Sequence, residues 1–201
     1  MVKSEDIQSV FFLGIGGIGM SALARYFHIR GYRVAGYDRT PSPLTQELEH
    51  EGIAITYQDD VKWFESQLLP QKHTLVVRTP AVPEETELCI YLRAQNYTIL
   101  KRAEVLGLIT KQMKSLCVAG THGKTTTSTM LAHLLYQSEI GTNAFLGGIS
   151  LNYGTNVLLQ KESPYVVVEA DEYDRSFRQL SPYIAIITAV DPAHLDIYGT
   201  Q

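Results

Sequence analysis

The sequence predicts an α/β protein made of two consecutive units, in each of which strands alternate with helices. Two observations support this fold class. Short apolar runs rich in valine, isoleucine and phenylalanine recur between segments whose apolar residues have helical spacing. Two glycine-rich turns, at 14–19 and 120–123, each follow an apolar run and lead into a helical segment. Strands that alternate with crossover helices form a parallel sheet with right-handed connections, so ligands are expected at the carboxyl ends of the strands.

The first unit begins with a glycine-rich turn between a strand and a helix. The apolar run 10–13 predicts the strand, the turn reads Gly-Ile-Gly-Gly-Ile-Gly over 14–19, and helical spacing over 20–30 predicts the helix. A second strand, predicted at 33–37, ends at Asp38. The pattern G-x-G-x-x-G, with an acid near the end of the second strand, is the fingerprint of a Rossmann-like dinucleotide site.

This fingerprint leaves the ligand open. Taken alone it predicts an NAD enzyme, in which the acid binds ribose hydroxyls. The glycines, however, indicate only that the backbone must approach a diphosphate closely, and a nucleotide sugar such as a UDP-sugar also carries a diphosphate. A tight strand–helix turn without any ligand is the simplest alternative.

The rest of the first unit continues the alternation. We expect helices at 44–51, 84–96 and 103–110 and strands at 53–57, 74–78 and 98–101. Glycines at positions 31 and 52 are expected to end helices. Gly14, Asp38 and Thr79 each come directly after a predicted strand, so we expect the three residues at one edge of the sheet.

Length and composition limit the classes of protein to which this chain can belong. The chain has 201 residues, of which 45% are hydrophobic and 19% charged, as in a soluble globular protein. A polar segment at 111–115 predicts a boundary between a first domain, 1–112, and a second domain, 113–201. A net charge of -4 argues against nonspecific nucleic-acid binding. Cys89 and Cys117 are expected as reduced core thiols, and neither a signal peptide nor a membrane span is recognisable, so we expect a cytoplasmic protein.

The second unit begins with a phosphate-binding pattern. The apolar run 116–119 predicts a buried strand, the turn 120–123 reads Gly-Thr-His-Gly, and Lys124 and Thr125 open a helix. The N–H groups of such a turn cradle phosphate oxygens, the lysine meets the terminal phosphates, and the threonine hydroxyl holds Mg²⁺. The usual pattern has a further glycine where this chain has Val118. The alternative, an ordinary turn with a chance Lys-Thr pair, leaves three consecutive threonines unexplained.

Acidic residues follow a later strand of the second unit. We expect a helix at 125–137, a strand at 142–146 followed by two glycines, a strand at 165–168 and a buried strand at 184–188. Four acids occur within residues 169–174. They predict either a solvated loop or a metal-binding edge beside the triphosphate, to which Glu169 would contribute. His194 follows the last strand and is either a surface residue or a metal ligand. Because Mg²⁺ prefers oxygen ligands, a histidine ligand is not the default expectation.

The motifs of the two units stand in one order along the chain: GIGGIGMSALA, GYDRTPS, KRAEVLG, VAGTHGKTTT, AFLGG, VVEADEYDRSF and HLDIYG. This series spans nearly the whole chain and resembles the ATP-dependent Mur ligases of peptidoglycan synthesis. The motifs GIGGIGM and KRAEVLG narrow the resemblance to the alanine-adding branch of the family and to its recycling branch, which attaches a preformed tripeptide.

The resemblance implies a ligase that forms an amide bond. ATP would phosphorylate the lactoyl carboxylate of UDP-N-acetylmuramate, and the amine of L-alanine would attack the resulting acyl phosphate. ATP would be held by Gly120, Thr121, His122, Gly123, Lys124, Thr125 and Thr126, the UDP-sugar by Gly14, Gly16, Gly17, Gly19, Asp38, Thr79, Arg102 and Glu104, and Mg²⁺ by Thr125, Glu169 and His194. Catalytic roles would fall to Lys124, Glu169, His194 and His122, of which His122 is alternatively a structural cap.

Two departures from the family pattern qualify these expectations. Where the family has an asparagine and an acid near the histidine, this chain has Ala189 and Ala193, so Asp191 or Asp196 would have to orient His194. Family members have three domains, and this chain stops soon after HLDIYG. We therefore expect a truncated central domain, no C-terminal ligase domain, no ligation by the chain alone, and a monomer or weak homodimer.

Two other classes of protein stay open on the residues alone. An NAD-dependent oxidoreductase with a remnant phosphate loop fits the glycine fingerprint, although no hydride-transfer residues are identifiable. A noncatalytic nucleotide-sensing module would keep Lys124 and would not need Glu169. Within the ligase interpretation, the residues do not separate an alanine from a tripeptide acceptor, because the acceptor site would lie in the C-terminal domain.

Overall fold

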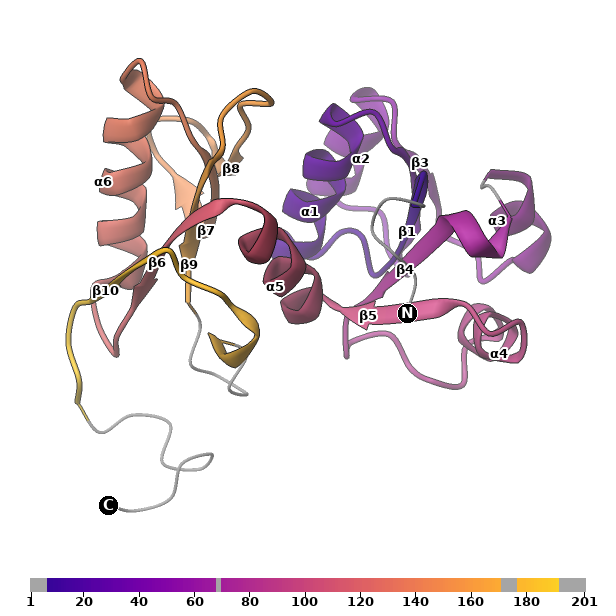
Figure 1. Cartoon of the computed structure of the whole chain (residues 1–201). Coiled ribbons are helices and arrows are strands. Elements are labelled where there is room, and N and C mark those ends of the chain that lie inside the picture. The colour runs from indigo at the N-terminus through magenta and orange to yellow at the C-terminus, as the bar shows by residue number, and fades with distance from the viewer. Residues whose placement is uncertain (1–6, 68–69, 171–176, 192–201) are drawn as a thin grey trace. The chain divides into compact units, whose positions relative to one another are not determined.

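The computed structural model describes residues 7–67, 70–170 and 177–191, and the chain divides into two compact units, Met1–Arg102 and Ala103–Gln201 (Figure 1). Each unit has a five-stranded sheet of its own. The division falls directly after Arg102, the first residue of helix α5 (Arg102–Gln112), whereas the boundary expected from the polar segment follows this helix.

The first unit is a doubly wound parallel sheet. Its elements are β1 (Ser9–Leu13), α1 (Ile18–Ile29), β2 (Arg33–Tyr37), α2 (Pro43–His50), β3 (Ala54–Thr56), α3 (Val61–Gln67), the 3-10 turn η2 (Gln71–His73), β4 (Thr74–Arg78), α4 (Glu87–Ala94) and β5 (Thr98–Lys101). The strand order is β3-β2-β1-β4-β5, and every pair is parallel. The order reverses between β1 and β4, which is where sheets of this kind bind ligands. The predicted fold class of this unit is confirmed.

Side chains of the central strand β1 pack against helices on both faces of the first sheet. Its alternating side chains point to opposite sides, so Phe11 meets Phe64 of α3 with ring centroids 4.7 Å apart, while Phe12 meets Phe27 of α1 at 6.3 Å. Helices α1 and α2 cover one face and α3 and α4 the other (Figure 1). Because both faces are covered, all five residues of β1 are buried.

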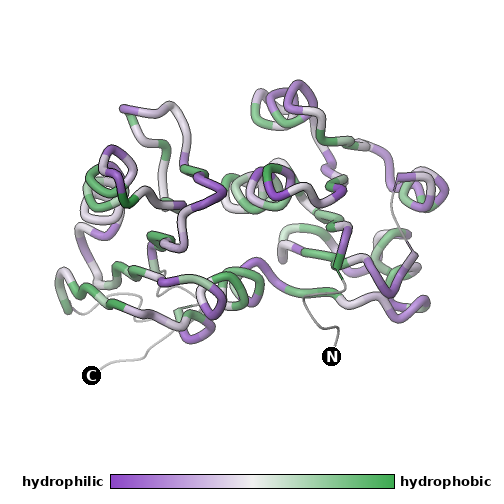
Figure 2. Tube along the Cα trace, turned by 45° about the horizontal axis from the view of Figure 1, so that its top comes forward, coloured by the Kyte–Doolittle hydropathy of each residue, from purple (hydrophilic) through white to green (hydrophobic). Residues whose placement is uncertain are grey.

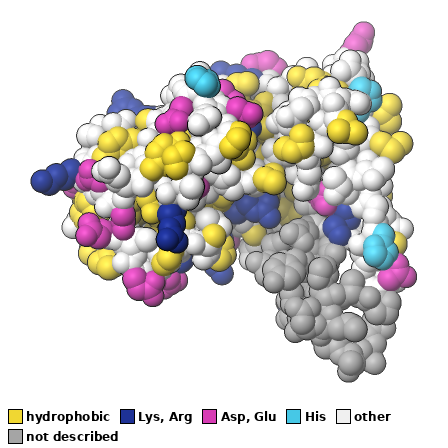
Figure 3. Space-filling view, turned by 180° about the vertical axis from the view of Figure 1, so that it is seen from behind, with side chains coloured by type: hydrophobic (Ala, Val, Ile, Leu, Met, Phe, Trp, Pro, Cys, Tyr) yellow, Lys and Arg dark blue, Asp and Glu magenta, His cyan; other side chains and the backbone are white. Residues whose placement is uncertain are grey.

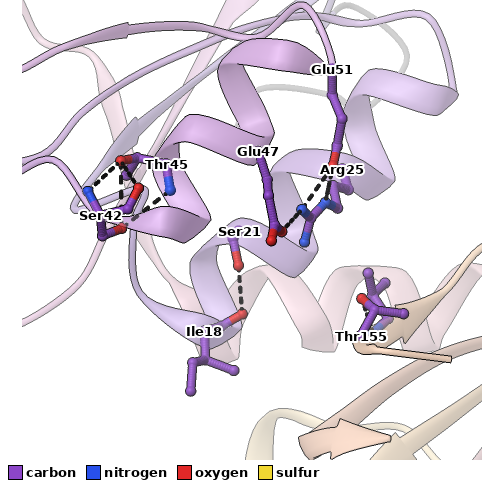
Figure 4. A network of polar contacts seen from close by, with 9 residues as sticks. Ile18, Ser21, Arg25, Ser42, Thr45, Glu47, Glu51 and Thr155 are labelled. Carbon is purple, nitrogen blue, oxygen red and sulfur yellow. Dashed lines mark hydrogen bonds and ion pairs between the residues drawn. The ribbon is translucent and has the colours of Figure 1, made fainter. Parts of the chain in front are cut away.

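Helices α1 and α2 are joined by polar contacts (Figure 4). Arg25 of α1 forms ion pairs with Glu51 at 2.7 Å and with Glu47 at 3.0 Å. At the start of α2, Ser42 and Thr45 form a capping box, in which each side chain accepts a hydrogen bond from the other residue's backbone N–H. The capping box and the ion pairs therefore fix the segment that follows Asp38, and Asp38 itself contacts Gly16 of the glycine-rich turn.

The second unit is a mixed sheet. After α5 come β6 (Lys114–Ala119), α6 (Lys124–Gln137), β7 (Asn143–Ser150), β8 (Thr155–Leu158), β9 (Tyr165–Glu169) and β10 (Ile184–Ile187). The strand order is β10-β6-β9-β7-β8, with β8 antiparallel to β7 and the other pairs parallel. Leu116, Ala132, Ala144 and Val167 are among the buried residues that join α6 to this sheet.

Three expectations about elements were wrong or incomplete. Helix α3 was not predicted, although Asp60 Oδ1 accepts the N–H groups of Lys62 and Trp63 as an N-terminal cap. Strand β8 and the second half of β7 were not predicted either, because the glycines at 147 and 148 suggest a loop and instead lie within β7, at an irregular stretch of its pairing with β8. The strand expected at 184–188 is present as β10, but its side chains are largely exposed, whereas β8 at the other edge of the sheet is mostly buried.

The surface and the cysteines agree with a globular protein. On the face seen in Figure 3, Lys and Arg side chains of the described residues are scattered among Asp and Glu and do not gather into one basic area. Hydrophobic stretches lie within strands and helices, and many connecting turns are hydrophilic (Figure 2). Among the described helices, none is both long and apolar enough to cross a membrane. Cys89 and Cys117 are buried free thiols, as expected, and burial raises the pKa of the Cys117 thiol.

Candidate functional site

The glycine-rich turn of the first unit packs against the end of a neighbouring strand. Gly14, directly after β1, has a φ of +85°, which L side chains rarely adopt. A Cβ at this position would lie 2.3 Å from Cγ2 of Thr79, the residue that follows β4. The turn and Thr79 thus meet at the carboxyl ends of β1 and β4, where the strand order reverses.

Asp38 and Arg102 both lie against this turn. The Gly16 N–H donates to Oδ2 of Asp38 at 2.7 Å, and a Cβ on Gly16 would lie 2.8 Å from the same oxygen. A Cβ on Gly19 would lie 2.8 Å from Cδ and Nη1 of Arg102. Around Gly17 there is more room, since the nearest atom to a Cβ would be 3.6 Å away. The structure therefore brings one carboxylate and one guanidinium together beside three glycines.

This arrangement can recognise an anionic ligand. The turn leads directly into the N-terminus of α1, where backbone N–H groups and the helix dipole favour negative charge. The Arg102 guanidinium adds a permanent positive charge beside Gly19. Asp38 supports the turn through Gly16, which is a structural role that the sequence did not predict. Glu104 lies in the first turn of α5, in the second unit.

The second unit carries the phosphate-binding loop between β6 and α6. The loop turns at Gly120, with a φ of +128°, and Gly123, with a φ of +78°, and Lys124 is the first residue of α6. The Lys124 ammonium donates to the Gly120 carbonyl at 2.7 Å, so the cation lies over the loop. The strand–turn–helix expected from the sequence is confirmed, and Thr126 lies in the first helical turn.

Polar groups from α6, β7 and β9 meet at the Glu169 carboxylate. The Thr125 hydroxyl donates to Oε1 of Glu169 at 3.0 Å, and the Gly147 N–H of β7 donates to Oε2 at 2.9 Å. A hydroxyl and a carboxylate are the kind of ligands that Mg²⁺ prefers, and two protein ligands suffice when phosphates and water complete an octahedron. These residues thus fit a Mg²⁺ ion, although the described residues contain no cluster of three or more His, Cys, Asp and Glu suited to a metal.

The tip of the loop is tied to the end of β10. The Thr121 N–H donates to the Ala189 carbonyl at 2.9 Å, and the Thr121 hydroxyl donates to Asp191 at 3.4 Å. His122 Nε2 lies 3.8 Å from Oδ2 of Asp191, and the histidine side chain is 76% exposed. The Thr188 hydroxyl reaches the carbonyl of His122. His122 is therefore at an accessible tip of the loop.

Some expected site residues stay untested by this geometry. His194 and most of the acidic segment after Glu169 lie outside the described residues. Asp191, one of the two acids expected to orient His194, contacts Thr121. The sequence also missed a contributor, Gly147, whose N–H binds Glu169. A glycine within a strand pattern is a known signal of close backbone approach, and it could have identified this residue.

Two family models together match most of the chain. Residues 9–114 match the model described as Mur ligase family, catalytic domain, and residues 118–201 match the Mur ligase middle domain. The chain therefore belongs to the Mur ligase family.

Curated relatives and solved structures agree with this assignment. A UDP-N-acetylmuramate–L-alanine ligase of Phocaeicola vulgatus is 60% identical over 98% of this chain and 43% of the relative, and one of Porphyromonas gingivalis is 57% identical over 96% and 42%. The crystal structure of a UDP-N-acetylmuramate-alanine ligase from Thermotoga maritima matches with a TM-score of 0.79 and 33% identity, covering 96% of this chain and 44% of that one. A UDP-N-acetylmuramate:L-alanyl-gamma-D-glutamyl-meso-diaminopimelate ligase from Neisseria meningitides matches with a TM-score of 0.81 and 26% identity, covering 96% and 64%. The chain spans less than half the length of these curated relatives.

Proposed function

We propose that this chain carries the nucleotide-sugar and ATP sites of a ligase that joins L-alanine to the lactoyl carboxylate of UDP-N-acetylmuramate, through an acyl phosphate, in peptidoglycan synthesis. The observation that carries the proposal is the identity of 57–60%, over nearly the whole chain, to relatives named for that reaction. Because ATP and a nucleotide sugar are cytoplasmic metabolites, the proposed reaction takes place in the cytoplasm. The functional boundary of the two domains is proposed at 112/113.

Sequence identity favours the alanine acceptor over a tripeptide acceptor. The two solved structures named above have nearly the same TM-scores, 0.79 and 0.81, although one is an alanine ligase and the other a peptide ligase. Their identities to this chain differ, at 33% and 26% respectively. The curated relatives at 57–60% are alanine ligases, which supports the same choice.

The residues of the phosphate loop have separable tasks in the proposed reaction. A carboxylate that attacks a phosphoryl group brings two anions together, so neutralising charge and holding the reactants in line dominate the barrier. The Lys124 ammonium and the loop N–H groups supply positive potential where charge develops. Thr125 and Glu169 would hold Mg²⁺, which supplies charge neutralisation on the phosphates when bound. His122 lies at the exposed loop tip, within reach of a substrate that approaches from solvent.

The first unit would bind the substrate. The turn 14–19, with Arg102 beside Gly19, offers N–H groups and a cation to the diphosphate of UDP-N-acetylmuramate. In the NAD interpretation, Asp38 would have to bind ribose hydroxyls. One oxygen of its carboxylate already accepts the Gly16 N–H, which favours a role for Asp38 in shaping the turn.

Thermal unfolding with UDP-N-acetylmuramate, Mg-ATP and NADH in parallel tests the proposal. A ligand at about 100 times its dissociation constant stabilises by about 2.7 kcal/mol, which raises the midpoint by roughly 5–10 °C in a chain of this size. We expect a shift with the UDP-sugar and none with NADH. Lys124→Ala should abolish any response to Mg-ATP and preserve the response to the UDP-sugar. A shift with NADH alone would contradict the ligase proposal and support an oxidoreductase.

A further inference from the structure

The two carboxylate oxygens of Glu169 have different partners. Oε1 accepts the Thr125 hydroxyl at 3.0 Å, so this oxygen faces the first turn of α6. Oε2 accepts the Gly147 N–H at 2.9 Å and lies 3.5 Å from the Ser128 hydroxyl. Ser128 is fully buried and also donates to the Thr125 carbonyl at 3.1 Å. The carboxylate is thus oriented from β7 on one side and from α6 on the other.

Gly147 permits this contact because it has no side chain. A Cβ at position 147 would lie 2.4 Å from Oε2 of Glu169 and 2.5 Å from the carboxylate carbon. The φ of Gly147 is not in the left-handed region, so an alanine there is opposed by the carboxylate and not by its own backbone. The adjacent Gly148 differs, because a Cβ there would meet only Thr125 Cγ2, at an ordinary 3.6 Å.

We propose that the Gly147 N–H is a positioning group for the metal site, which rests on the proposed function of Thr125 and Glu169 as Mg²⁺ ligands. By holding Oε2, the amide keeps Oε1 directed toward the Thr125 hydroxyl, so the two ligands converge on one ion. Strand β7 therefore orients a metal ligand of the nucleotide site through a backbone amide. Groups that orient metal ligands in this way typically change metal affinity 10–100-fold when they are lost.

The test is Mn²⁺ binding in the presence of the non-hydrolysable ATP analogue AMP-PNP, measured by electron paramagnetic resonance. Gly147→Ala should weaken Mn²⁺ binding by about 10–100-fold. Gly148→Ala is the matched control and should change it less than about twofold, since its Cβ meets no polar group. The double variant Gly147→Ala/Glu169→Asp shortens the carboxylate side chain by one methylene and should recover part of the lost affinity. Equal affinity in Gly147→Ala and Gly148→Ala would overturn the proposal.

A ligand-free measurement keeps the proposal testable if Gly147→Ala does not fold. The amide of Gly147 should show a hydrogen-bonded chemical shift in ¹⁵N-edited nuclear magnetic resonance spectra, and Glu169→Ala should move that signal while leaving Gly148 little changed. An unmoved Gly147 signal would overturn the positioning role. If wild type and Glu169→Ala bind Mn²⁺ equally, the proposed metal site is wrong. If only Glu169→Ala weakens binding, the metal site stands and the role of Gly147 is refuted.

Discussion

Gly120→Ala should destabilise the second unit far more than a usual glycine-to-alanine change. Gly120 has a φ of +128°, and a Cβ there would lie 2.3 Å from Oγ1 of Thr188 and 2.8 Å from both N and O of Ala189. The loop and the end of β10 are joined at this point, since the Thr188 N–H donates to the Ala119 carbonyl at 3.0 Å and the Thr121 N–H to the Ala189 carbonyl at 2.9 Å. An alanine therefore strains the backbone and separates the two segments.

The structure sets the magnitude of this loss. The positive φ costs about 1–3 kcal/mol for a residue with a side chain. The Thr188 side chain can rotate away only by giving up its bonds to the Ala119 and His122 carbonyls, and a shift of Ala189 breaks the bond from Thr121, at about 1 kcal/mol for each bond lost. Together these terms predict a loss of about 4–6 kcal/mol.

Urea unfolding followed by far-ultraviolet circular dichroism measures this loss. Gly154→Ala is the matched control, because Gly154 lies in the same unit with a φ of +64°, and a Cβ there would have no neighbouring atom within 4 Å, so only backbone strain of about 1–2 kcal/mol is expected. With a slope of about 1.5 kcal/mol/M, Gly120→Ala should lower the midpoint by about 2 M or more. If both variants lose the same free energy of unfolding, the steric reasoning is refuted.

Three further predictions concern single side chains. Asp59→Ala should lower the free energy of unfolding by about 0.5–2 kcal/mol in urea, because Asp59 accepts the first backbone N–H groups of α4, and Asp59→Asn should lose less. The hydrogen bond and charge of Arg93 lower the pKa of Glu84, so ionised Glu84 stabilises the fold above about pH 4.5, and this stabilisation is lost as the pH falls through the folded pKa. The difference in free energy of unfolding between wild type and Glu84→Gln, measured in urea, should therefore shrink from about pH 7 to about pH 3. A constant difference would contradict this. Burial raises the pKa of Cys117, so iodoacetamide should label Cys117 and the buried Cys89 slowly in the native protein and rapidly in urea, and rapid native labelling of Cys117 would show that β6 is accessible.

Local patterns were sufficient for much of the backbone. The expected strands at 33–37, 74–78 and 98–101 have the bounds of β2, β4 and β5. Both glycine-rich turns were also found, because the conformations they require are encoded by adjacent residues: glycines where φ is positive, and a helix that starts directly afterwards. Helix α3 could have been found in the same way from its Asp60 cap.

Burial and long-range pairing could not be inferred in this way. The apolar residues of β10 were expected in the core, yet Ile184 is 48% exposed and Ile187 is 68% exposed. Strand β8, at the other edge of the same sheet, is mostly buried, so neither apolar composition nor strand order alone reports the burial of a strand. The cap of α4 also could not be predicted, because Asp59 accepts the N–H of Leu88 from 29 residues away and no local sequence pattern indicates this contact.

The sequence by itself therefore determined the fold class, the two nucleotide-type turns and the identity of Lys124, Thr125 and Glu169 as site candidates, because short-range backbone preferences and side-chain chemistry are written in neighbouring residues. Only the tertiary structure decided which groups meet: Arg102 beside Gly19, Asp38 on Gly16, and Gly147 on Glu169. Each of these contacts joins residues at least 22 positions apart, and each depends on the order and register of strands, which are set by packing of the whole sheet.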